Sequence, residues 1–448
     1  MNHDRDMTTG NPFILIGTFS FSLIIGNIFQ QLYMVVDSMI IGKKIGPLGL
    51  AAIGGTEWLI FLVQGFVIGL IQGFSVILGN KYGEKDEQAF EAYYQKSKKI
   101  CFVLSMILVI LLVAISDILL ELIGTKEEVF CYAKQYVNTI FMGLPFLIFY
   151  QFFAAVLRCR GNSRIYLIAM TVSSVCNIIL DILFVSVLNF GIIGAACGTI
   201  ISEFIVMMIC RYHVNKGRKT QRAKSATYKE KDTVKQLMFM GLPMAMQSVI
   251  TAVGGLIVVN RINQYEITFL TGYTVAGKLY ALLEIAASSY GLAVATYVSQ
   301  NYGANKYQRI KKGVRSSLLI GMITSFLCSY IMICGGKEIM WLFIAPSDMA
   351  YEMIEYGYRY LKILAIFFPF LYVLYIIRAT LQGINNSMIP MISSFAQLTM
   401  RLLCAIILTK FIGSDGIYWG EITAWLFADL ILIVSYYYNM HKIGMYRK

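Results

Sequence analysis

Two carboxylates lie where a lipid bilayer would make them costly. Asp37 interrupts an apolar run at about 13–42, and Asp181 interrupts another at about 165–188. An acid at the centre of a bilayer costs about 2.5–3.5 kcal/mol on insertion scales, so each intramembrane acid is a candidate functional residue. Asn177 precedes Asp181 by four residues, which places the two side chains one turn apart on the same helix face.

The spacing predicts that these residues lie at one depth in the membrane. Asp37 lies about 5 residues before the end of its run, and Asp181 about 8 residues before the turn that follows. Thr199 lies 8 residues into the next run, with Glu203 one turn below it. At 1.5 Å per residue, Asp37, Asp181 and Thr199 come about 8–12 Å below the outer surface. The sequence therefore predicts a cluster of carboxylate, amide and hydroxyl oxygens.

Such a cluster has two chemical uses. Two neighbouring carboxylates in a low dielectric share protons, because like charge and desolvation both disfavour the doubly ionised pair. The same oxygens could instead coordinate a hard monovalent cation such as Na⁺. The residues alone leave both uses open, and they also allow a third, in which Asp37 and Asp181 pair with polar groups only for packing.

The chain contains two related halves. The segment from Pro145 reads PFLIFYQFFAAVLRCRGNS, and the segment from Pro369 reads PFLYVLYIIRATLQGINNS. The shift between them is 224 residues in a chain of 448 residues. Two similar apolar halves around a central cleft are typical of secondary transporters.

The composition is that of a polytopic membrane protein. Hydrophobic residues make up 58% and charged residues 14%, against about 25% charged residues in soluble domains, and the mean hydropathy is +0.66. No β periodicity competes, so we expect an all-α membrane protein with two six-helix lobes related by a pseudo-two-fold axis along the membrane normal. The expected spans are 13–42, 49–79, 99–121, 133–157, 165–188, 191–212, 235–260, 267–299, 316–342, 357–383, 388–410 and 416–439.

The basic residues predict the orientation. With a cytoplasmic N-terminus, the inside segments hold 26 Lys and Arg residues and the outside segments hold 6. This bias follows the positive-inside rule. It predicts a multi-pass protein of the cytoplasmic membrane with both termini on the cytoplasmic side. We expect an N-terminal lobe at 1–214, a cytoplasmic linker at 215–233 and a C-terminal lobe at 234–448.

Several classes of function lack the residues they need. The net charge of +13 is explained by the loops between spans, so we expect no nucleic-acid partner. The nine cysteines form no CxxC pair, and the three histidines lie near expected cytoplasmic ends. We therefore expect no cofactor and no metal centre, apart from Na⁺ as an option at the acidic cluster. No nucleophile or acid–base constellation favours an enzyme.

The C-terminal half does not repeat the acidic cluster. Arg401 occupies the repeat position of Asn177, and Ala405 replaces Asp181. Glu284, near the middle of the eighth span, could attract a cationic substrate, or it could form a structural ion pair with Lys278 or Arg401. We expect Glu284 to line a substrate cavity together with Glu203 and Tyr33.

Local motifs along the whole chain resemble the multidrug and toxic compound extrusion (MATE) family, most closely its DinF-like branch. The motifs are LYMVVDSMIIG (Leu32–Gly42), LRCRGNS (Leu157–Ser163), LQGINNS (Leu381–Ser387) and VSQNYGA (Val298–Ala304). The resemblance implies a proton or cation site formed by Asp37, Asn177, Asp181 and Thr199, which is the cluster that the depth count predicts. It also implies that Glu284 matches an acid of some drug exporters. Many relatives carry a proline where this chain has Ser22.

These observations favour an antiporter that exports bulky, cationic organic compounds in exchange for H⁺ or Na⁺ by alternating access. The alternative is a lipid or polyprenyl-lipid flippase, in which Arg378 and Arg401 would bind a phosphate head group. The substrate, the coupling ion and the oligomeric state stay open at this point.

Overall fold

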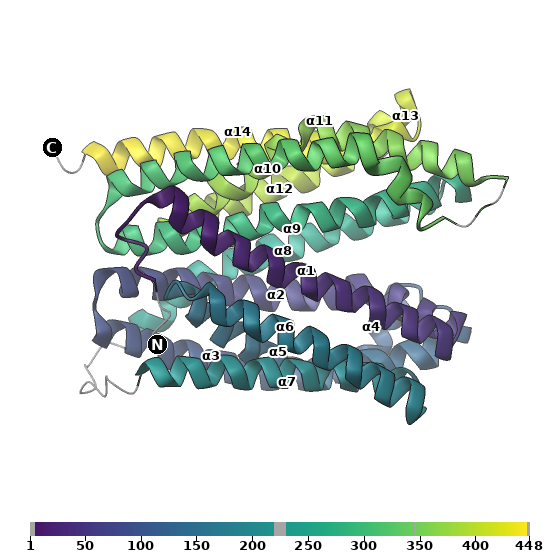
Figure 1. Ribbon diagram of the computed structural model, residues 1–448, viewed down its shortest axis with the longest axis horizontal. Helices are drawn as coiled ribbons and strands as arrows, with labels where there is room; N and C mark the ends of the chain where they lie inside the picture. The colour runs from purple at the N-terminus through teal and green to yellow at the C-terminus, as the bar shows by residue number, and fades with distance from the viewer. Residues whose placement is uncertain (1–4, 219–229, 345, 347, 446–448) are drawn as a thin grey trace. The chain divides into compact units, whose positions relative to one another are not determined.

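The computed structural model describes residues 5–218, 230–344, 346 and 348–445, and the regular elements in these ranges are all helices (Figure 1). In chain order they are α1 (Pro12–Lys44), α2 (Pro47–Glu84), α3 (Glu87–Ala114), α4 (Ser116–Leu122), α5 (Glu127–Cys159), α6 (Ser163–Asp181), the π-helix η1 (Ile182–Val187), α7 (Gly191–Arg218), α8 (Glu230–Ile262), α9 (Ile267–Gly303), α10 (Tyr307–Trp341), α11 (Ala350–Gly383), α12 (Met388–Leu403), the π-helix η2 (Cys404–Leu408), α13 (Thr409–Ile412) and α14 (Asp415–Met445).

Over the described ranges, twelve helices are long and apolar enough to cross a membrane. The predicted all-α class and the number of spans are confirmed. The third span differs most from its expected range of 99–121, since α3 begins at Glu87 and ends at Ala114. Asp86 explains the early start, because its side chain accepts a hydrogen bond from the Ala89 amide at 2.9 Å and so caps the first turn.

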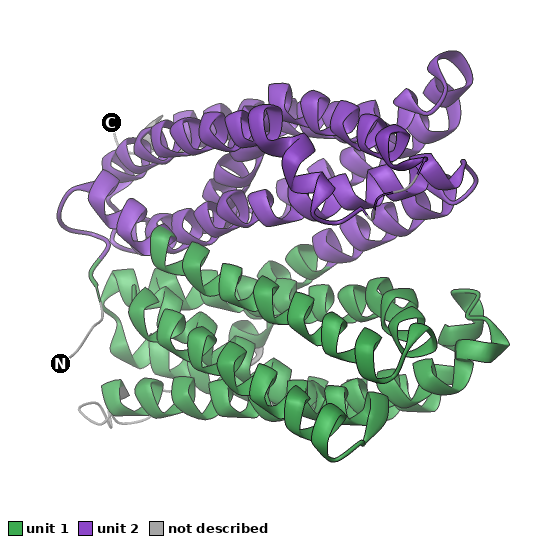
Figure 2. Cartoon of the chain, turned by 45° about the vertical axis from the view of Figure 1, so that its right-hand side comes forward, with its two compact units in different colours: residues 1–6, 21–245 green, residues 7–20, 246–448 purple. Residues whose placement is uncertain are grey.

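The chain divides into two compact units (Figure 2). Unit 1 comprises residues 1–6 and 21–245, and unit 2 comprises residues 7–20 and 246–448. The expected lobes at 1–214 and 234–448 stay a prediction, as does the linker at 215–233. Residues 219–229 of that linker lie outside the described residues, whereas its two ends continue α7 and begin α8.

The two units repeat one packing pattern, which extends the sequence repeat to three dimensions. In unit 1, α5 packs against α2, α3 and α7, while α7 also packs against α6. In unit 2, α11 packs against α9, α10 and α14, while α14 also packs against α12. Each contact therefore has a counterpart about half a chain later. In unit 1, α5 is the most enclosed span: 72% of its most apolar stretch is buried, against 28% for α1.

The paired loop motifs form the same turn in both units. Gly161 and Asn385 follow α5 and α11 and have positive φ values of 76° and 65°. The next amide along each turn, of Asn162 and Asn386, reaches back to close a six-residue cap at 2.9 and 3.0 Å. The Asn162 side chain then accepts a hydrogen bond from the Ile165 amide at 3.2 Å, which starts α6. The motif thus ends one helix and begins the next.

The VSQNYGA motif holds the segment before α1. Within unit 2, the Met7 amide donates to the Gln300 side chain at 2.9 Å, and the Asn301 side chain donates to the Met7 carbonyl at 3.0 Å. The Lys306 ammonium donates to the Thr8 carbonyl at 2.9 Å. Met7 and Thr8 are buried. Side chains at the end of α9 and just before α10 therefore satisfy backbone groups that have no helix partner.

Candidate functional site: an acidic cluster in unit 1

Three elements of unit 1 position the predicted cluster. Asp37 lies near the end of α1, Asn177 and Asp181 lie one turn apart at the end of α6, and Thr199 lies on α7. α6 packs against α7, and Ile41 of α1 packs with Val185 and Ala195 at the same end. The structure therefore brings the four residues together, as the depth count predicts.

The side chains at this site are enclosed and close to one another. Asp181 is fully buried, Asn177 is 1% exposed and Asp37 is 8% exposed. The carboxyls of Asp37 and Asp181 face each other closely enough to interact directly. The Asn177 amide donates to the Thr199 hydroxyl at 3.5 Å, which is long for a hydrogen bond.

Most oxygens of the cluster receive no hydrogen bond from the described residues. They are Asp37 Oδ1, Asn177 Oδ1 and both carboxylate oxygens of Asp181. A buried polar atom without a partner is unusual and calls for a physical explanation. These oxygens are suited to hold a proton between two carboxylates or to ligate a hard cation such as Na⁺.

Gly198, which was not among the predicted site residues, makes room for the Asp181 carboxylate. A methyl group at this position would collide with Asp181 Oδ1. The carboxylate thus lies directly against the α7 backbone, next to Thr199. Glycines in membrane-spanning helices often mark such a close approach, and this is the signal that could have identified Gly198.

The helix widens immediately after Asp181. Residues Ile182–Val187 form the π-helix η1, and Cys404–Leu408 form η2 at the corresponding place in unit 2. π-helical turns are rare and frequently occur at functional sites. The wide turn lies directly beyond the acidic cluster in unit 1, and in unit 2 it begins three residues after Arg401.

Two tyrosines border the cluster. Tyr33 lies one turn before Asp37 on α1 and within electrostatic reach of Glu203, Asp37 and Asp181. Glu203 is half-buried on α7. Tyr136 on α5 is buried within electrostatic reach of Asp37 and Asp181. Tyr136 was not predicted, because a lone tyrosine in an apolar run carries no sequence signal.

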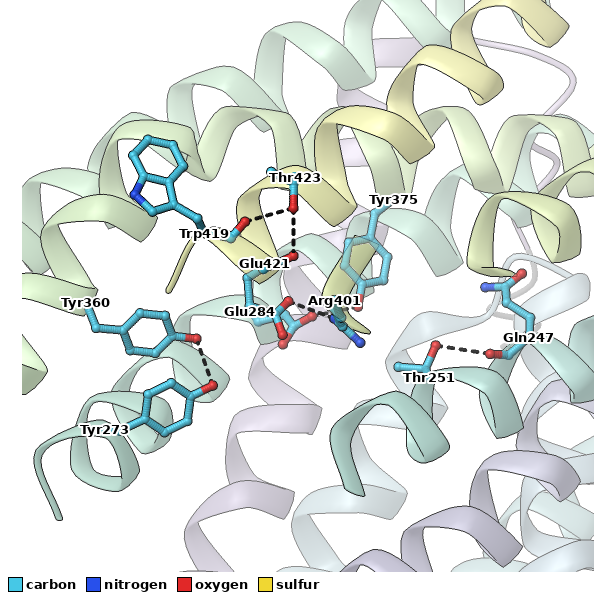
Figure 3. A network of polar contacts seen from close by, with 11 residues as sticks. Gln247, Thr251, Tyr273, Glu284, Tyr360, Tyr375, Arg401, Trp419, Glu421 and Thr423 are labelled. Carbon is cyan, nitrogen blue, oxygen red and sulfur yellow. Dashed lines mark hydrogen bonds and ion pairs between the residues drawn. The ribbon is translucent and has the colours of Figure 1, made fainter. Parts of the chain in front are cut away.

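Unit 2 holds Glu284 in a different network (Figure 3). The Tyr375 hydroxyl donates to Glu284 Oε1 at 2.8 Å. Arg401 forms an ion pair with Glu421 at 2.7 Å, and both side chains are largely buried. The hypothesis of a Glu284–Arg401 ion pair is therefore not supported. Lys278, the other cation considered as a partner of Glu284, is exposed. Glu421 already neutralises Arg401. Arg401, one of the two arginines expected to bind a lipid phosphate in the flippase alternative, therefore has a protein partner.

Comparison with known proteins agrees with this architecture. A model of the MatE family matches residues 22–183 and 243–407, one segment in each half. The chain belongs to the MATE family. Among its relatives, the probable multidrug resistance protein YoeA of Bacillus subtilis is 26% identical over 437 residues, which cover 95% of this chain and 93% of that protein. The multidrug export protein MepA of Staphylococcus haemolyticus is 23% identical over 412 residues, covering 91% and 89% of the two chains.

Solved MATE structures share the fold. A crystal structure of MATE in complex with MaL6 superposes with a TM-score of 0.90 at 19% identity and covers 98% of this chain and 99% of that one. The outward-facing conformation of a multidrug resistance MATE family transporter gives a TM-score of 0.88 at 19% identity, covering 98% of both chains. At this level of identity the likeness establishes the fold alone.

Proposed function

We propose that this MATE protein is an antiporter that exports organic cations in exchange for H⁺ or Na⁺ bound at Asp37, Asn177, Asp181 and Thr199. The main support is the set of buried oxygens without protein donors at this site, since intramembrane acids mark ion pathways in transporters. The relatives named as multidrug resistance and export proteins add support for organic substrates.

The coupling follows from charge at the cluster. Without a bound ion, Asp37 on α1 and Asp181 on α6 repel each other across a short gap. A proton or Na⁺ removes this repulsion and holds α1 against α6 and α7. α1 is one of the least enclosed spans and so has few contacts that hold it in place. Ion binding therefore changes the position of α1. Exchange then requires that substrate favours the other arrangement.

We assign the substrate contact to Tyr33, Glu203 and Glu284. Tyr33 lies next to both Glu203 and the ion cluster, so a cation bound against Glu203 would sense whether the cluster is occupied. Glu284 offers a second half-buried carboxylate, which accepts a hydrogen bond from the Tyr375 hydroxyl. Aromatic faces and carboxylates together suit a bulky organic cation.

A transport assay tests the proposal. Purified protein in liposomes loaded with rhodamine 123, a fluorescent organic cation, would be given an inward proton gradient and then an inward sodium gradient. One of the two gradients should drive dye efflux in the wild type. Asp181→Asn should lose gradient-driven efflux, because the amide can neither release a proton nor supply a carboxylate to Na⁺.

The matched control is Asp117→Asn, which removes an acid of the same unit that forms an ion pair with Lys134 and belongs to neither proposed site. This variant should export at the wild-type rate. Efflux that continues unchanged in Asp181→Asn would contradict the proposed coupling site.

We also propose that the protein resides in the cytoplasmic membrane with both termini on the cytoplasmic side. The support is the 26-to-6 distribution of basic residues between alternating loops.

A further inference from the structure

Arg378 and Asp429 differ from the other charged residues in the spans of unit 2. Arg401 is neutralised by Glu421 at 2.7 Å, and Glu284 accepts a hydrogen bond from Tyr375 at 2.8 Å. Those contacts form the network in Figure 3. Arg378 and Asp429 lie outside this network of hydrogen bonds and have no such partners.

Arg378 lies on α11 and is 8% exposed. Two of its guanidinium nitrogens, Nε and Nη2, are buried without a hydrogen-bond acceptor. The guanidinium lies 5.9 Å from the centre of the Tyr375 ring. This cation–π contact accepts no hydrogen bond from these two nitrogens.

Asp429 lies on α14, which packs against α11, and it is 3% exposed. Both carboxylate oxygens are buried without a donor. Asp429 and Arg378 act on each other electrostatically, yet no ion pair joins them in the part of the chain that the structure describes. An acid and a base thus lie within electrostatic reach of each other without forming an ion pair.

Leaving both groups unpaired is costly. Burying an ion carries a desolvation penalty, which a partner with good geometry offsets. Of the neighbouring acids, Glu421 pairs with Arg401, and Glu284 forms no ion pair with Arg378 in the described part of the chain. A ligand from outside the protein would supply partners to both groups.

We propose that Arg378 and Asp429 form a binding site for a zwitterionic group of the substrate, with its acid on Arg378 and its cation on Asp429. A carboxylate or phosphate matches the planar donor fork of arginine. A simple anion would also face Asp429, and a simple cation would also face Arg378, so a group with both charges complements the site best. The inference rests on the proposed function and narrows its substrate class.

Two related dyes test this site. Rhodamine 110 carries a free carboxylate beside its cationic ring system, and rhodamine 123 is its methyl ester and carries only the cation. Binding of each dye to the purified full-length protein would be measured by fluorescence anisotropy. The wild type should bind rhodamine 110 more tightly than rhodamine 123.

Arg378→Gln should raise the Kd of rhodamine 110 about tenfold or more, because hydrogen bonds to charged groups contribute about 1.5–3 kcal/mol. The same variant should leave the Kd of rhodamine 123 unchanged or lower it, which also shows that the variant is folded. Asp429→Asn should weaken rhodamine 110 as well. Arg211→Gln, which removes an exposed arginine of unit 1, should change neither Kd.

The possible failures are distinguishable. If the wild type binds neither dye, the proposed export of organic cations and this site are both contradicted. If rhodamine 123 binds and rhodamine 110 is bound no more tightly, or is unaffected by Arg378→Gln, only the zwitterion site is overturned. If Arg378→Gln and Arg378→Lys both abolish binding of rhodamine 123, Arg378 is a structural residue and the inference is again wrong.

Discussion

At the scale of single residues, the proposed ion site depends on a carboxylate that touches a helix backbone. Asp181 Oδ1 occupies the space that a Cβ at position 198 would need. Four of the nearby oxygens lack protein donors, so the geometry leaves their lone pairs for an ion. A site of this kind is sensitive to small displacements, because moving a functional side chain by about 1 Å can lower the rate of the process it serves by about a hundredfold.

Gly198→Ala should therefore impair ion coupling while leaving every charged residue in place. The added methyl group displaces the Asp181 carboxylate from α7. We expect the concentration of coupling ion needed for half-maximal efflux to rise about tenfold, which corresponds to about 1.4 kcal/mol. The measurement is dye efflux from proteoliposomes over a range of pH or Na⁺ concentration.

Gly55→Ala is the matched control, since a methyl group at position 55 of α2 meets no atom within 4 Å. It should behave as the wild type. An unchanged ion dependence in Gly198→Ala would show that Asp181 does not need its observed position.

At the scale of elements, the helix ends are more precisely specified than the helix middles. Gly161 ends α5 with φ of 76°, and the Arg5 carbonyl lies where its Cβ would be. Lys85 ends α2 with φ of 58° in the same kind of cap. A left-handed residue with a Cβ costs about 1–2 kcal/mol relative to glycine, so the two positions make opposite predictions.

Gly161→Ala should lower the free energy of unfolding by at least about 1–2 kcal/mol. The reason is the positive φ together with the collision with the Arg5 carbonyl. Lys85→Gly should leave stability unchanged or raise it slightly, because glycine adopts positive φ without strain. Thermal unfolding of the purified protein in detergent checks both variants. Equal stability of Gly161→Ala and the wild type would contradict the account of the turn.

The sequence specifies these elements unevenly. The twelve spans were predictable because each contains an apolar stretch long enough to cross the bilayer. The start of α3 and the short helices α4 and α13 were not predicted, since hydropathy does not report where polar helical turns begin. The π-helices η1 and η2 have no sequence signature in these apolar runs.

The candidate site was predictable in part. Counting residues from the helix ends placed Asp37, Asp181 and Thr199 at one depth, and the structure brings them together. Their function as an ion site stays a prediction. The Arg401–Glu421 ion pair was not predicted, because it depends on which faces of α12 and α14 meet. Sequence spacing within one helix cannot give that information.

At the scale of the whole molecule, the two halves share one fold but carry different chemistry. Unit 1 holds two neighbouring acids on α1 and α6, whereas the corresponding position of Asn177 in unit 2 holds Arg401, balanced by Glu421. We infer that unit 1 handles the ion and that unit 2 contributes charged contacts to the substrate. Such a division of tasks makes exchange a competition between two ligands for two arrangements of one protein.

The most direct test is whether substrate binding expels the ion. Purified protein in weakly buffered solution would be mixed with rhodamine 123, and the released protons would be followed with a pH dye, or displaced ²²Na⁺ would be counted after pre-loading. The account predicts release of one of the two ions from the wild type and none from Asp181→Asn. Dye binding to the wild type without release of either ion, or equal release from Asp181→Asn, would contradict the central claim.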